Sequence, residues 1–275
     1  IARATGPIKD QPGTPRGRLS LVSLGPGQEG WRSGEAAQRL RDAEDIIGFK
    51  AYFNLIEDIP LSGDIHTFEI GAESDRVQKA FALAATGRRV ALICSGDAGI
   101  YAMAALAFEI LEETPHASWR RILIDVAPGI SAMQAAAARI GAPLGHDFCT
   151  ISLSDLLTPW PIIERRIKAA AKGDFVVAFY NPVSKRRVTQ LPAARDILLS
   201  HRAKNTPVVL ARNLGRPDEA VRVISLDELS TDGVDMTTLV LVGSSETRRI
   251  NRGCEGVWVY TPRGYTAKQV EGTGE

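Results

Sequence analysis

The sequence lacks several features that would place it in a well-defined class of proteins. Its 275 residues contain only three cysteines, Cys94, Cys149 and Cys254, which are far apart and form no C-x-x-C pair. This spacing predicts neither a metal site nor a disulfide framework and is typical of a reducing compartment. The longest apolar run, Ile100 to Phe108, is well short of the ~18 residues that suggest a membrane span. We therefore expect a cytoplasmic protein that does not cross a membrane.

An excess of charge of one sign is also lacking. The chain has 33 Lys and Arg residues against 32 Asp and Glu residues, a formal net charge of +1. No overall basic field is available to hold nucleic acid or an anionic membrane, so we expect neither partner. The pattern G-x-x-x-x-G-K-[ST] occurs nowhere, which argues against a P-loop nucleotidase.

What the sequence does contain is a regular alternation of strand-like and helix-like segments. From Arg18 onward, short β-branched runs alternate with amphipathic or Ala-rich segments, as in βα units around a mainly parallel sheet. In the first half we expect strands at 19–24, 45–48, 66–70, 89–94 and 122–126, and helices at 33–43, 100–112 and 131–140.

The second half is expected to form another α/β domain. Its strand-like segments are 149–153, 175–179, 208–212, 220–226 and 238–242, and its helices are 162–172 and 191–200. The alternation of Val221, Val223 and Leu226 indicates a half-exposed strand, which favours a mixed sheet. We therefore expect a flexible leader at 1–17, an N-terminal α/β domain at 18–147, a C-terminal α/β domain at 148–263 and a flexible tail at 264–275.

One glycine-rich segment imitates a dinucleotide-binding motif. Residues 25–30, Gly-Pro-Gly-Gln-Glu-Gly, satisfy G-x-G-x-x-G and follow a strand. In the true fingerprint the glycines open the helix, whereas here Trp31 and Arg32 intervene before the expected N-cap at Ser33. The acidic residue Asp45 also stands at the start of the next strand rather than at its end. We interpret the segment as a turn that closes a strand.

A hydrolase-type nucleophile is not supported either. Residues 129–133, Gly-Ile-Ser-Ala-Met, nearly match G-x-S-x-G, but Met133 occupies the position at which the sharp turn needs a glycine. Ser131 is better interpreted as a helix N-cap. His146 and His201 follow it, but isolated histidines in such positions are more often structural than catalytic.

The loop at residues 95–101, Ser-Gly-Asp-Ala-Gly-Ile-Tyr, has the clearest functional signal. It leaves a buried strand at its carboxyl end, the edge at which open α/β sheets bind ligands. Its glycines let the backbone approach a ligand, and Asp97 can accept hydrogen bonds from hydroxyl or ammonium groups. The alternative is that Asp97 only caps the following helix.

Basic clusters stand near two other strand ends. Lys185-Arg186-Arg187 follows Tyr180-Asn181-Pro182, and Arg248-Arg249 follows the strand that ends near Val242. In an electrically balanced protein such clusters suit a ligand with several carboxylates, because guanidinium groups bind carboxylates in pairs. The alternative for each cluster is a solvated face.

Seven motifs, taken in their order, resemble the tetrapyrrole methylases, the S-adenosylmethionine-dependent enzymes of cobalamin biosynthesis. They are LGPG, SGDAGIY, APGISA, APLGHDF, ISLSDLLTPW, FYNP and VGSSETR, and the resemblance covers about Arg18 to Tyr265. The segments Gly145 to Phe148 and Ile151 to Trp160 are the most specific, since they resemble the branch that methylates C17 of precorrin-3B.

The resemblance implies a two-domain fold, usually a homodimer, with S-adenosylmethionine in a cleft between the domains. The cofactor contacts that it implies in the first half are Gly96, Asp97, Ile100, Tyr101, Ser131 and Ala132. Those that it implies in the second half are Tyr180, Arg212, Asn213, Thr237 and Thr238. A tetrapyrrole with carboxylate arms would meet Pro26, Gly27, Lys185, Arg186, Arg187 and Arg248.

The reaction implied is methyl transfer to C17 of precorrin-3B with ring contraction to precorrin-4. Because a methyl sulfonium is already electrophilic, the protein mainly has to align the donor with the acceptor carbon. His146, Asp147 and Asp155 lie in the branch-specific motifs and are the candidates for proton transfer. Many relatives carry Asp after the GPG turn, whereas this chain has Gln28, which cannot ionise.

Two other functions fit the same resemblance. One is a sister methylase that acts on another carbon or on cobalt-factor III, the cobalt-containing substrate of the anaerobic route. The other is a non-catalytic tetrapyrrole-binding protein, which would bind its ligands without turnover.

Overall fold

A computed structural model describes residue 13 and residues 15–265, so the expected leader and tail lie mostly outside the described residues. Contacts along the chain divide it into two compact units. Among the described residues, the first comprises those up to Leu24 and Arg32–Gly129, and the second comprises Gly25–Trp31 and those from Ile130 onward. The division falls before helix α4 (Ala132–Ile140) and not near residue 147, because α4 packs on the sheet of the second unit.

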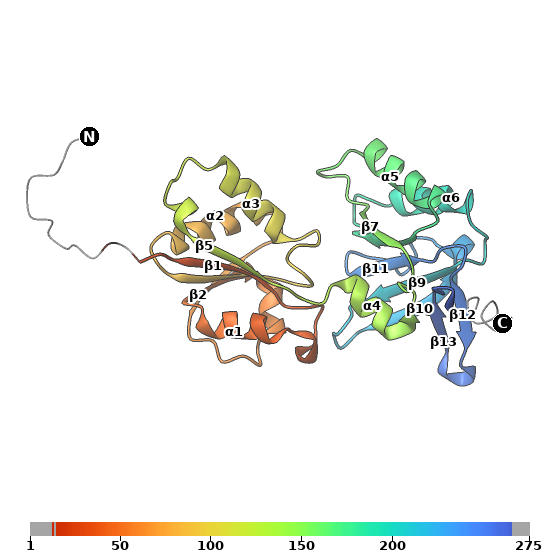
Figure 1. Ribbon diagram of the computed structural model, residues 1–275, viewed down its shortest axis with the longest axis horizontal. Helices are drawn as coiled ribbons and strands as arrows, with labels where there is room; N and C mark the ends of the chain where they lie inside the picture. Colours follow the sequence, from red (N-terminus) through yellow and green to blue (C-terminus); the bar gives the residue numbers. More distant parts are fainter. Residues whose placement is uncertain (1–12, 14, 266–275) are drawn as a thin grey trace, which may run out of the picture. The chain divides into compact units, whose positions relative to one another are not determined.

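The first unit is a parallel sheet with helices on both faces (Figure 1). The strand order is β3-β2-β4-β1-β5, and all of the pairings are parallel, as the sequence predicts. The strands are β1 (Arg18–Ser23), β2 (Asp45–Phe49), β3 (Asp64–Phe68), β4 (Arg89–Cys94) and β5 (Leu123–Ala127). The helices are α1 (Gly34–Asp42), α2 (Glu73–Ala84) and α3 (Met103–Glu113), with short 3₁₀ turns η2 (Lys50–Leu55) and η3 (Trp119–Arg121).

Alternate residues of β1 explain the two helical layers of this unit. Leu19 and Leu21 share a buried cluster with residues of α2 and α3, whereas Val22 belongs to the cluster of α1 on the other face. The neighbouring strands β1 and β4 are therefore followed by helices on opposite faces. This arrangement is a topological switch point, and open α/β sheets bind ligands beside the carboxyl ends of such strands.

The second unit has a mixed sheet, as the sequence predicts, in the order β10-β9-β11-β8-β7. Only β7 and β8 are paired in parallel among its ladders. The strands are β7 (Phe148–Ser152), β8 (Val176–Tyr180), β9 (Pro207–Arg212), β10 (Ala220–Ser225) and β11 (Thr238–Val242). The helices α5 (Trp160–Lys172) and α6 (Gln190–Leu199) share one core with this sheet, and α4 shares the other.

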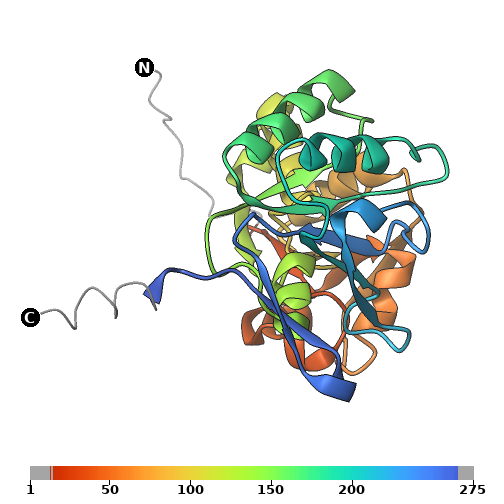
Figure 2. The same ribbon diagram turned by 90° about the vertical axis from the view of Figure 1, so that its right-hand side faces the viewer.

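A small sheet completes the second unit. It has the order β12-β13-β6, with β6 (Gly141–Ala142), β12 (Arg248–Asn251) and β13 (Val257–Tyr260). Figure 2 shows the β12–β13 hairpin beside α4, and β13 pairs with the β6 residues that follow this helix. Three further 3₁₀ turns are η1 (Glu29–Trp31), η4 (Leu226–Glu228) and η5 (Gly253–Glu255).

The sequence does not predict α2 or the β12–β13 hairpin. Helix α2 contains the polar residues Arg76 and Lys79 among its apolar ones, and the Arg76 side chain is buried in spite of its charge. All four residues of β12 are exposed, so the strand has no apolar alternation. Helix α3 begins at Met103 instead of Ile100, because Tyr101 adopts a φ of 51°, which α-helical backbone does not allow. None of the helices within the described ranges combines the length and apolarity that a bilayer crossing requires.

One buried cation contributes to the stability of the second unit. Arg202 is 6% exposed and donates to the carbonyl oxygens of Gly243 and Phe175, both at 2.5 Å. Burial lowers the pKa of this guanidinium, against the attraction of Asp174. We expect Arg202→Met to lower the free energy of unfolding by about 1–3 kcal/mol, because the buried Gly243 carbonyl and the Phe175 carbonyl both lose their donor. Urea unfolding measures the loss, with the exposed Arg166→Met as a control that should change little; equal stabilities of the two variants would contradict this role.

Candidate functional site

At the carboxyl edge of the first sheet, Asp97 joins the loops that leave β4 and β5. Its Oδ1 accepts from the Gly99 N–H at 2.8 Å, and its Oδ2 accepts from the Gly129 N–H at 3.0 Å. The Ser23 hydroxyl at the end of β1 accepts from the Ala98 N–H at 2.8 Å. Asp97 is thus not the cap of α3, whose N-cap position is Ala102. Both carboxylate oxygens hold loop backbone, so the residue positions the strand exits.

The backbone at these strand exits adopts positive φ angles, which residues with a side chain rarely adopt. Gly96 has a φ of 71°, and a Cβ added there would meet no atom within 4 Å. Three of the four non-glycine residues with positive φ in the described chain, Tyr101, Asn181 and Asn213, follow strands β4, β8 and β9. Strained backbone persists only where the surrounding structure maintains it, and it is often found at ligand sites.

In the second unit, the start of α4 and the end of β8 are directly connected. Ser131 caps α4 with a capping box to Gln134, as the sequence predicts, and is 1% exposed. The Tyr180 hydroxyl at the end of β8 accepts from the Met133 N–H at 3.2 Å. This bond satisfies one of the helix's free amides and brings Ser131, Ala132 and Tyr180 together.

The remaining implied cofactor residues of this unit lie at the same sheet edge. Strand β11 is antiparallel to both β8 and β9, so it begins where they end. Thr238, the first residue of β11, stands opposite Arg212, the last residue of β9. The Asn213 N–H donates to the Thr237 carbonyl at 3.3 Å. The structure therefore gathers Tyr180, Arg212, Asn213, Thr237 and Thr238 at one edge.

Asp235 organises this edge and was missed by the sequence analysis. Its Oδ1 accepts from the hydroxyls of Thr237 and Thr238 at 2.7 and 2.9 Å, and from the Thr237 N–H at 2.8 Å. Burial acts to raise the pKa of this carboxyl, but the threonine bonds and nearby Arg212 outweigh it and hold the pKa below its usual value. The sequence signal was present, because Asp-x-Thr-Thr is typical of an Asx turn.

Arg187 is the buried member of the basic cluster that follows β8. It is 4% exposed and donates to the Asn181 carbonyl at 3.0 Å and to the Ser154 hydroxyl at 3.3 Å. Ser154 follows β7, so this one side chain joins the loops that leave two neighbouring parallel strands. Lys185 and Arg186 of the same cluster are exposed.

Of the three candidates for proton transfer, only Asp155 lies at this edge. Its Oδ2 accepts from the Gln190 amide at 2.7 Å, and its Oδ1 is 3.9 Å from an Arg187 nitrogen. His146 and Asp147 precede β7 and thus stand where β7 and β8 begin, at the opposite edge. The Asp147 N–H donates to His146 Nδ1 at 2.8 Å. The structure does not bring this pair together with Asp155, since a whole strand separates them.

Arg248 is likewise separated from the other basic residues. Strand β11 runs antiparallel to β8, so Arg248, which comes after β11, follows the edge at which β8 begins. Its side chain is exposed and lies 3.6 Å from a Glu246 oxygen. The structure therefore does not group Arg248 with Arg187 and its neighbours.

The turn that includes Pro26 and Gly27 belongs to the second unit, although β1 before it belongs to the first. Arg216 Nε donates to the Pro26 carbonyl at 3.2 Å. A Cβ on Gly27 would stand 2.7 Å from the Gly215 carbonyl oxygen, so the two backbones are in close contact. No dinucleotide-type helix start is formed here, because η1 (Glu29–Trp31) follows the glycines and Ser33 caps α1.

Glu219 holds Gly215, which contacts Gly27 in this turn, and it should make the free energy of unfolding depend on pH. A hydrogen bond from Arg139 holds its pKa below the usual 4.5, against the effect of burial, and the Gly215 N–H helps. A lowered pKa in the folded state stabilises the fold above pH 4.5, and this contribution is lost as the pH falls through the folded value. Glu219→Gln should therefore be less stable than the wild type at pH 7, with a difference that shrinks below pH 4.5. Urea unfolding across this range tests the expectation, and a constant difference would contradict it.

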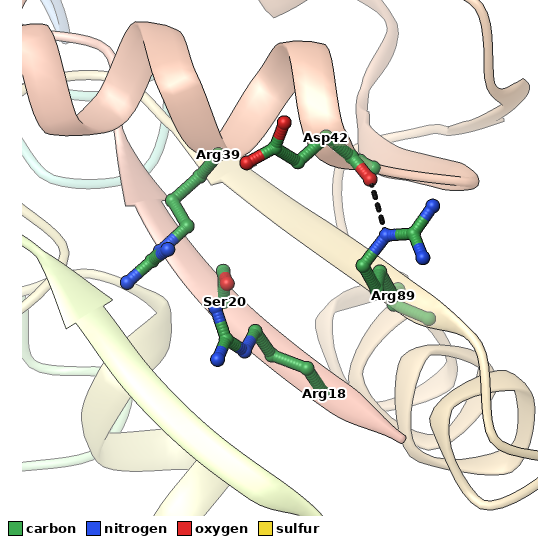
Figure 3. A pocket seen from close by; sticks show the side chains of 7 residues that line it. Arg18, Ser20, Arg39, Asp42 and Arg89 are labelled. Carbon is green, nitrogen blue, oxygen red and sulfur yellow. Dashed lines mark hydrogen bonds between the residues drawn. The ribbon is translucent and has the colours of Figure 1, made fainter. Parts of the chain in front are cut away.

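A pocket of about 130 Å³ lies at the opposite edge of the first sheet, where β1 and β4 begin (Figure 3). Its arginines have partners: Arg39 Nε lies 3.1 Å and Arg18 Nε 3.6 Å from Asp125 oxygens. Arg89 Nε donates to the Asp42 carbonyl at 2.7 Å, the dashed line in Figure 3. These ion pairs and hydrogen bonds tie the strand starts together, so we do not place the ligand site there.

Comparisons with known proteins identify the family of this chain. Residues 18–230 match the family model of the tetrapyrrole (corrin/porphyrin) methylases. The chain is 42% identical to a precorrin-3B C(17)-methyltransferase of Sinorhizobium sp., over 90% of this chain and 97% of that relative. It is also 42% identical to a probable cobalt-factor III C(17)-methyltransferase of Salmonella typhimurium, over 90% and 99% respectively.

A solved structure gives the same result for the fold. The crystal structure of the methyltransferase CobJ matches with a TM-score of 0.82 and 42% identity, covering 90% of this chain and 100% of that one. The family model spans most of the described residues of both units, and the identities extend along nearly the whole length of the relatives. The chain therefore belongs to the tetrapyrrole (corrin/porphyrin) methylases.

Proposed function

We propose that this chain is an S-adenosylmethionine-dependent C-methyltransferase that methylates C17 of precorrin-3B and contracts the ring to precorrin-4 in cobalamin biosynthesis. The observation that carries the proposal is the identity of 42% to the Sinorhizobium enzyme over 97% of its length. The strand-exit loops of each unit support it, because each set offers backbone and hydroxyl groups of the kind that bind parts of a nucleoside with an amino-acid tail.

The residues at each of the two edges, taken separately, fit chemical parts of S-adenosylmethionine. Open backbone at Gly96 suits close approach of a ligand. The amides of Ser131, Met133 and Gln134 at the start of α4 already donate within the protein, so Ser131 would shape the ligand site and not bind a carboxylate itself. Tyr180 and the hydroxyl of Thr237 suit the aromatic and ribose parts of adenosine, with Arg212, Asn213 and Thr238 beside them. Ile100, half-exposed Tyr101 and Ala132 would add apolar contacts. When bound, the cofactor supplies an electrophilic methyl group.

The chain's own contribution to the reaction would be orientation of the substrate. Lys185 and Arg186 are exposed beside the end of β8 and suit carboxylate arms, and buried Arg187 fixes the loop that carries them. The turn at Pro26 and Gly27 would meet the macrocycle. Asp155 is the candidate for moving a proton, because it is the one of the three acids and bases singled out in the sequence that lies at this edge. Holding donor and acceptor carbon in line would provide most of the acceleration.

Incubation with labelled S-adenosylmethionine and precorrin-3B tests the proposal. We expect the product to gain the mass of one methyl group with release of S-adenosylhomocysteine, and we expect no transfer to precorrin-2. Binding of the cofactor without labelled product would contradict the proposal and favour a carrier. A cobalt-loaded substrate belongs in the same experiment, because the relative from Salmonella is equally similar in sequence. Exclusive turnover of that substrate would place the chain in the anaerobic route.

On the family resemblance we also infer a cytoplasmic homodimer. Sedimentation of the purified protein would test whether it is a dimer.

A further inference from the structure

The turn that follows β1 is docked on the second unit through Trp31. This ring packs against the buried cluster that includes Val209, Ala211 and the α4 residue Met133. The chain then returns to the first unit at Arg32, which pairs with Asp58 at 2.8 Å. Residues 25–31, which we call the strap, thus belong to the second unit, although the residues before and after them in the sequence belong to the first.

Arg139, in the last turn of α4, is the centre of the contacts that hold this strap. Its guanidinium stacks over the Trp31 ring at 4.2 Å from the ring centroid. It pairs with both carboxylate oxygens of Glu219 at 2.6 and 3.2 Å. Glu219 in turn accepts from the Gly215 N–H at 2.6 Å, and Gly215 contacts the backbone of Gly27. One side chain therefore fixes the strap, α4 and the β9–β10 loop together.

The same guanidinium determines which end of the Gln28 side chain is free. Arg139 donates from Nη2 to Gln28 Oε1 at 3.2 Å. Because a guanidinium has only donors, the Gln28 oxygen must face it, and the amide nitrogen must face away. Gln28 is exposed, and no described residue accepts from its Nε2. A glutamine held in this way presents a hydrogen-bond donor to whatever lies beyond the turn.

We propose that Arg139 is a positioning residue that turns the Gln28 carboxamide so that Nε2 donates a hydrogen bond to an oxygen of the tetrapyrrole, such as a carboxylate arm. The inference rests on the proposed function. A carboxylate at this position would offer only acceptors, and a negative charge, to a ligand that is itself a polyacid. Position 28 is thus assigned to recognition of the substrate and not to proton abstraction.

A double-mutant cycle with Gln28→Met and Arg139→Lys tests the proposal. Gln28→Met keeps the side-chain length and removes the donor. We expect the KM for the tetrapyrrole to rise about tenfold or more, the lower end for a hydrogen bond to a charged acceptor, with kcat within about twofold. A lysine at position 139 cannot stack over Trp31 and also make two parallel hydrogen bonds to Glu219, so for Arg139→Lys we expect a similar rise in KM. Since Arg139 acts through Gln28, adding Arg139→Lys to Gln28→Met should raise KM no further. A merely structural Arg139 would give additive effects.

Gln28→Glu replaces the donor with a negative charge. We expect it to raise KM by about tenfold or more, because the new carboxylate repels the carboxylates of the substrate. Arg252→Lys is the matched control, because Arg252 stacks over Trp258 at 4.0 Å in the β12–β13 hairpin, and its KM should be unchanged. An increase in kcat for Gln28→Glu, or an unchanged KM for Gln28→Met, would overturn the inference. Failure of the wild type to methylate precorrin-3B would instead overturn the proposed function. In that case the role of Arg139 would still be decided by measuring the dissociation constant of the tetrapyrrole for the wild type, the two single variants and the double variant.

Discussion

Arg187→Ala should lower kcat/KM for the tetrapyrrole by about a hundredfold, which is the effect expected when reacting groups shift by about 1 Å. The substitution removes the donor that joins the Asn181 carbonyl to the Ser154 hydroxyl, so the loops after β8 and β7 lose their common anchor. Asp155 would also lose its neighbouring cation, 3.9 Å away. Steady-state kinetics with precorrin-3B would measure the loss.

The control for this variant is Arg195→Ala. Arg195 lies on α6 of the same unit and donates to the Leu229 carbonyl at 2.9 Å, away from the two loops. We expect it to leave kcat/KM nearly unchanged. Arg187→Ala should also lose about 1–3 kcal/mol of unfolding free energy, because a carbonyl is left without its donor, so the kinetics must be measured well below its unfolding temperature. Equal kinetics for the two variants would exclude Arg187 as the anchor of the site.

Asp97→Asn should weaken binding of S-adenosylhomocysteine by about tenfold or more. The loss in the free energy of unfolding should be smaller than the loss in the free energy of binding. One oxygen of the carboxylate becomes an amide nitrogen, which cannot accept from Gly99 or Gly129, so one of these two bonds is lost. A hydrogen bond to a charged acceptor contributes about 1.5–3 kcal/mol, and here much of it serves to hold the ligand loop in its strained conformation. Calorimetric titration would measure the dissociation constant.

Asp125→Asn is the matched control in the same unit. Asp125 lies on β5 and pairs with Arg39 at 3.1 Å beside the pocket at the opposite edge of the sheet. Its replacement should leave the dissociation constant for S-adenosylhomocysteine unaltered. If Asp97→Asn bound the ligand as tightly as Asp125→Asn, the loop at 95–101 would not be part of the donor site.

Most strands could be predicted from the sequence because they are buried on both faces or alternate regularly. Strand β4 is expected and observed at Arg89–Cys94, and β11 at Thr238–Val242. The parallel sheet of the first unit and the mixed sheet of the second were predicted correctly as well. Helix α2 and strand β12 could not be predicted, since their pattern depends on burial of Arg76 and on pairing with β13, which local periodicity does not contain.

The sequence locates the loop after β4, where small residues such as Gly96 interrupt the apolar pattern, and the helix start at Ser131. The edge of the sheet to which a residue belongs was not predictable, because it depends on strand direction. Thus His146 and Arg248 were grouped with residues of the opposite edge, from which the pairing of β7, β8 and β11 separates them. The role of Arg139 also depends on contacts between segments far apart in the sequence, so no motif reveals it.

The central claim is that the strand-exit loops of the first unit, those after β4 and β5, hold the methyl donor. A crystal structure of the chain with S-adenosylhomocysteine tests it most directly. We expect the ligand to contact the loop at Gly96 and Asp97. Density for the ligand at the pocket of Arg18, Arg39 and Arg89, or anywhere away from those loops, would contradict the account.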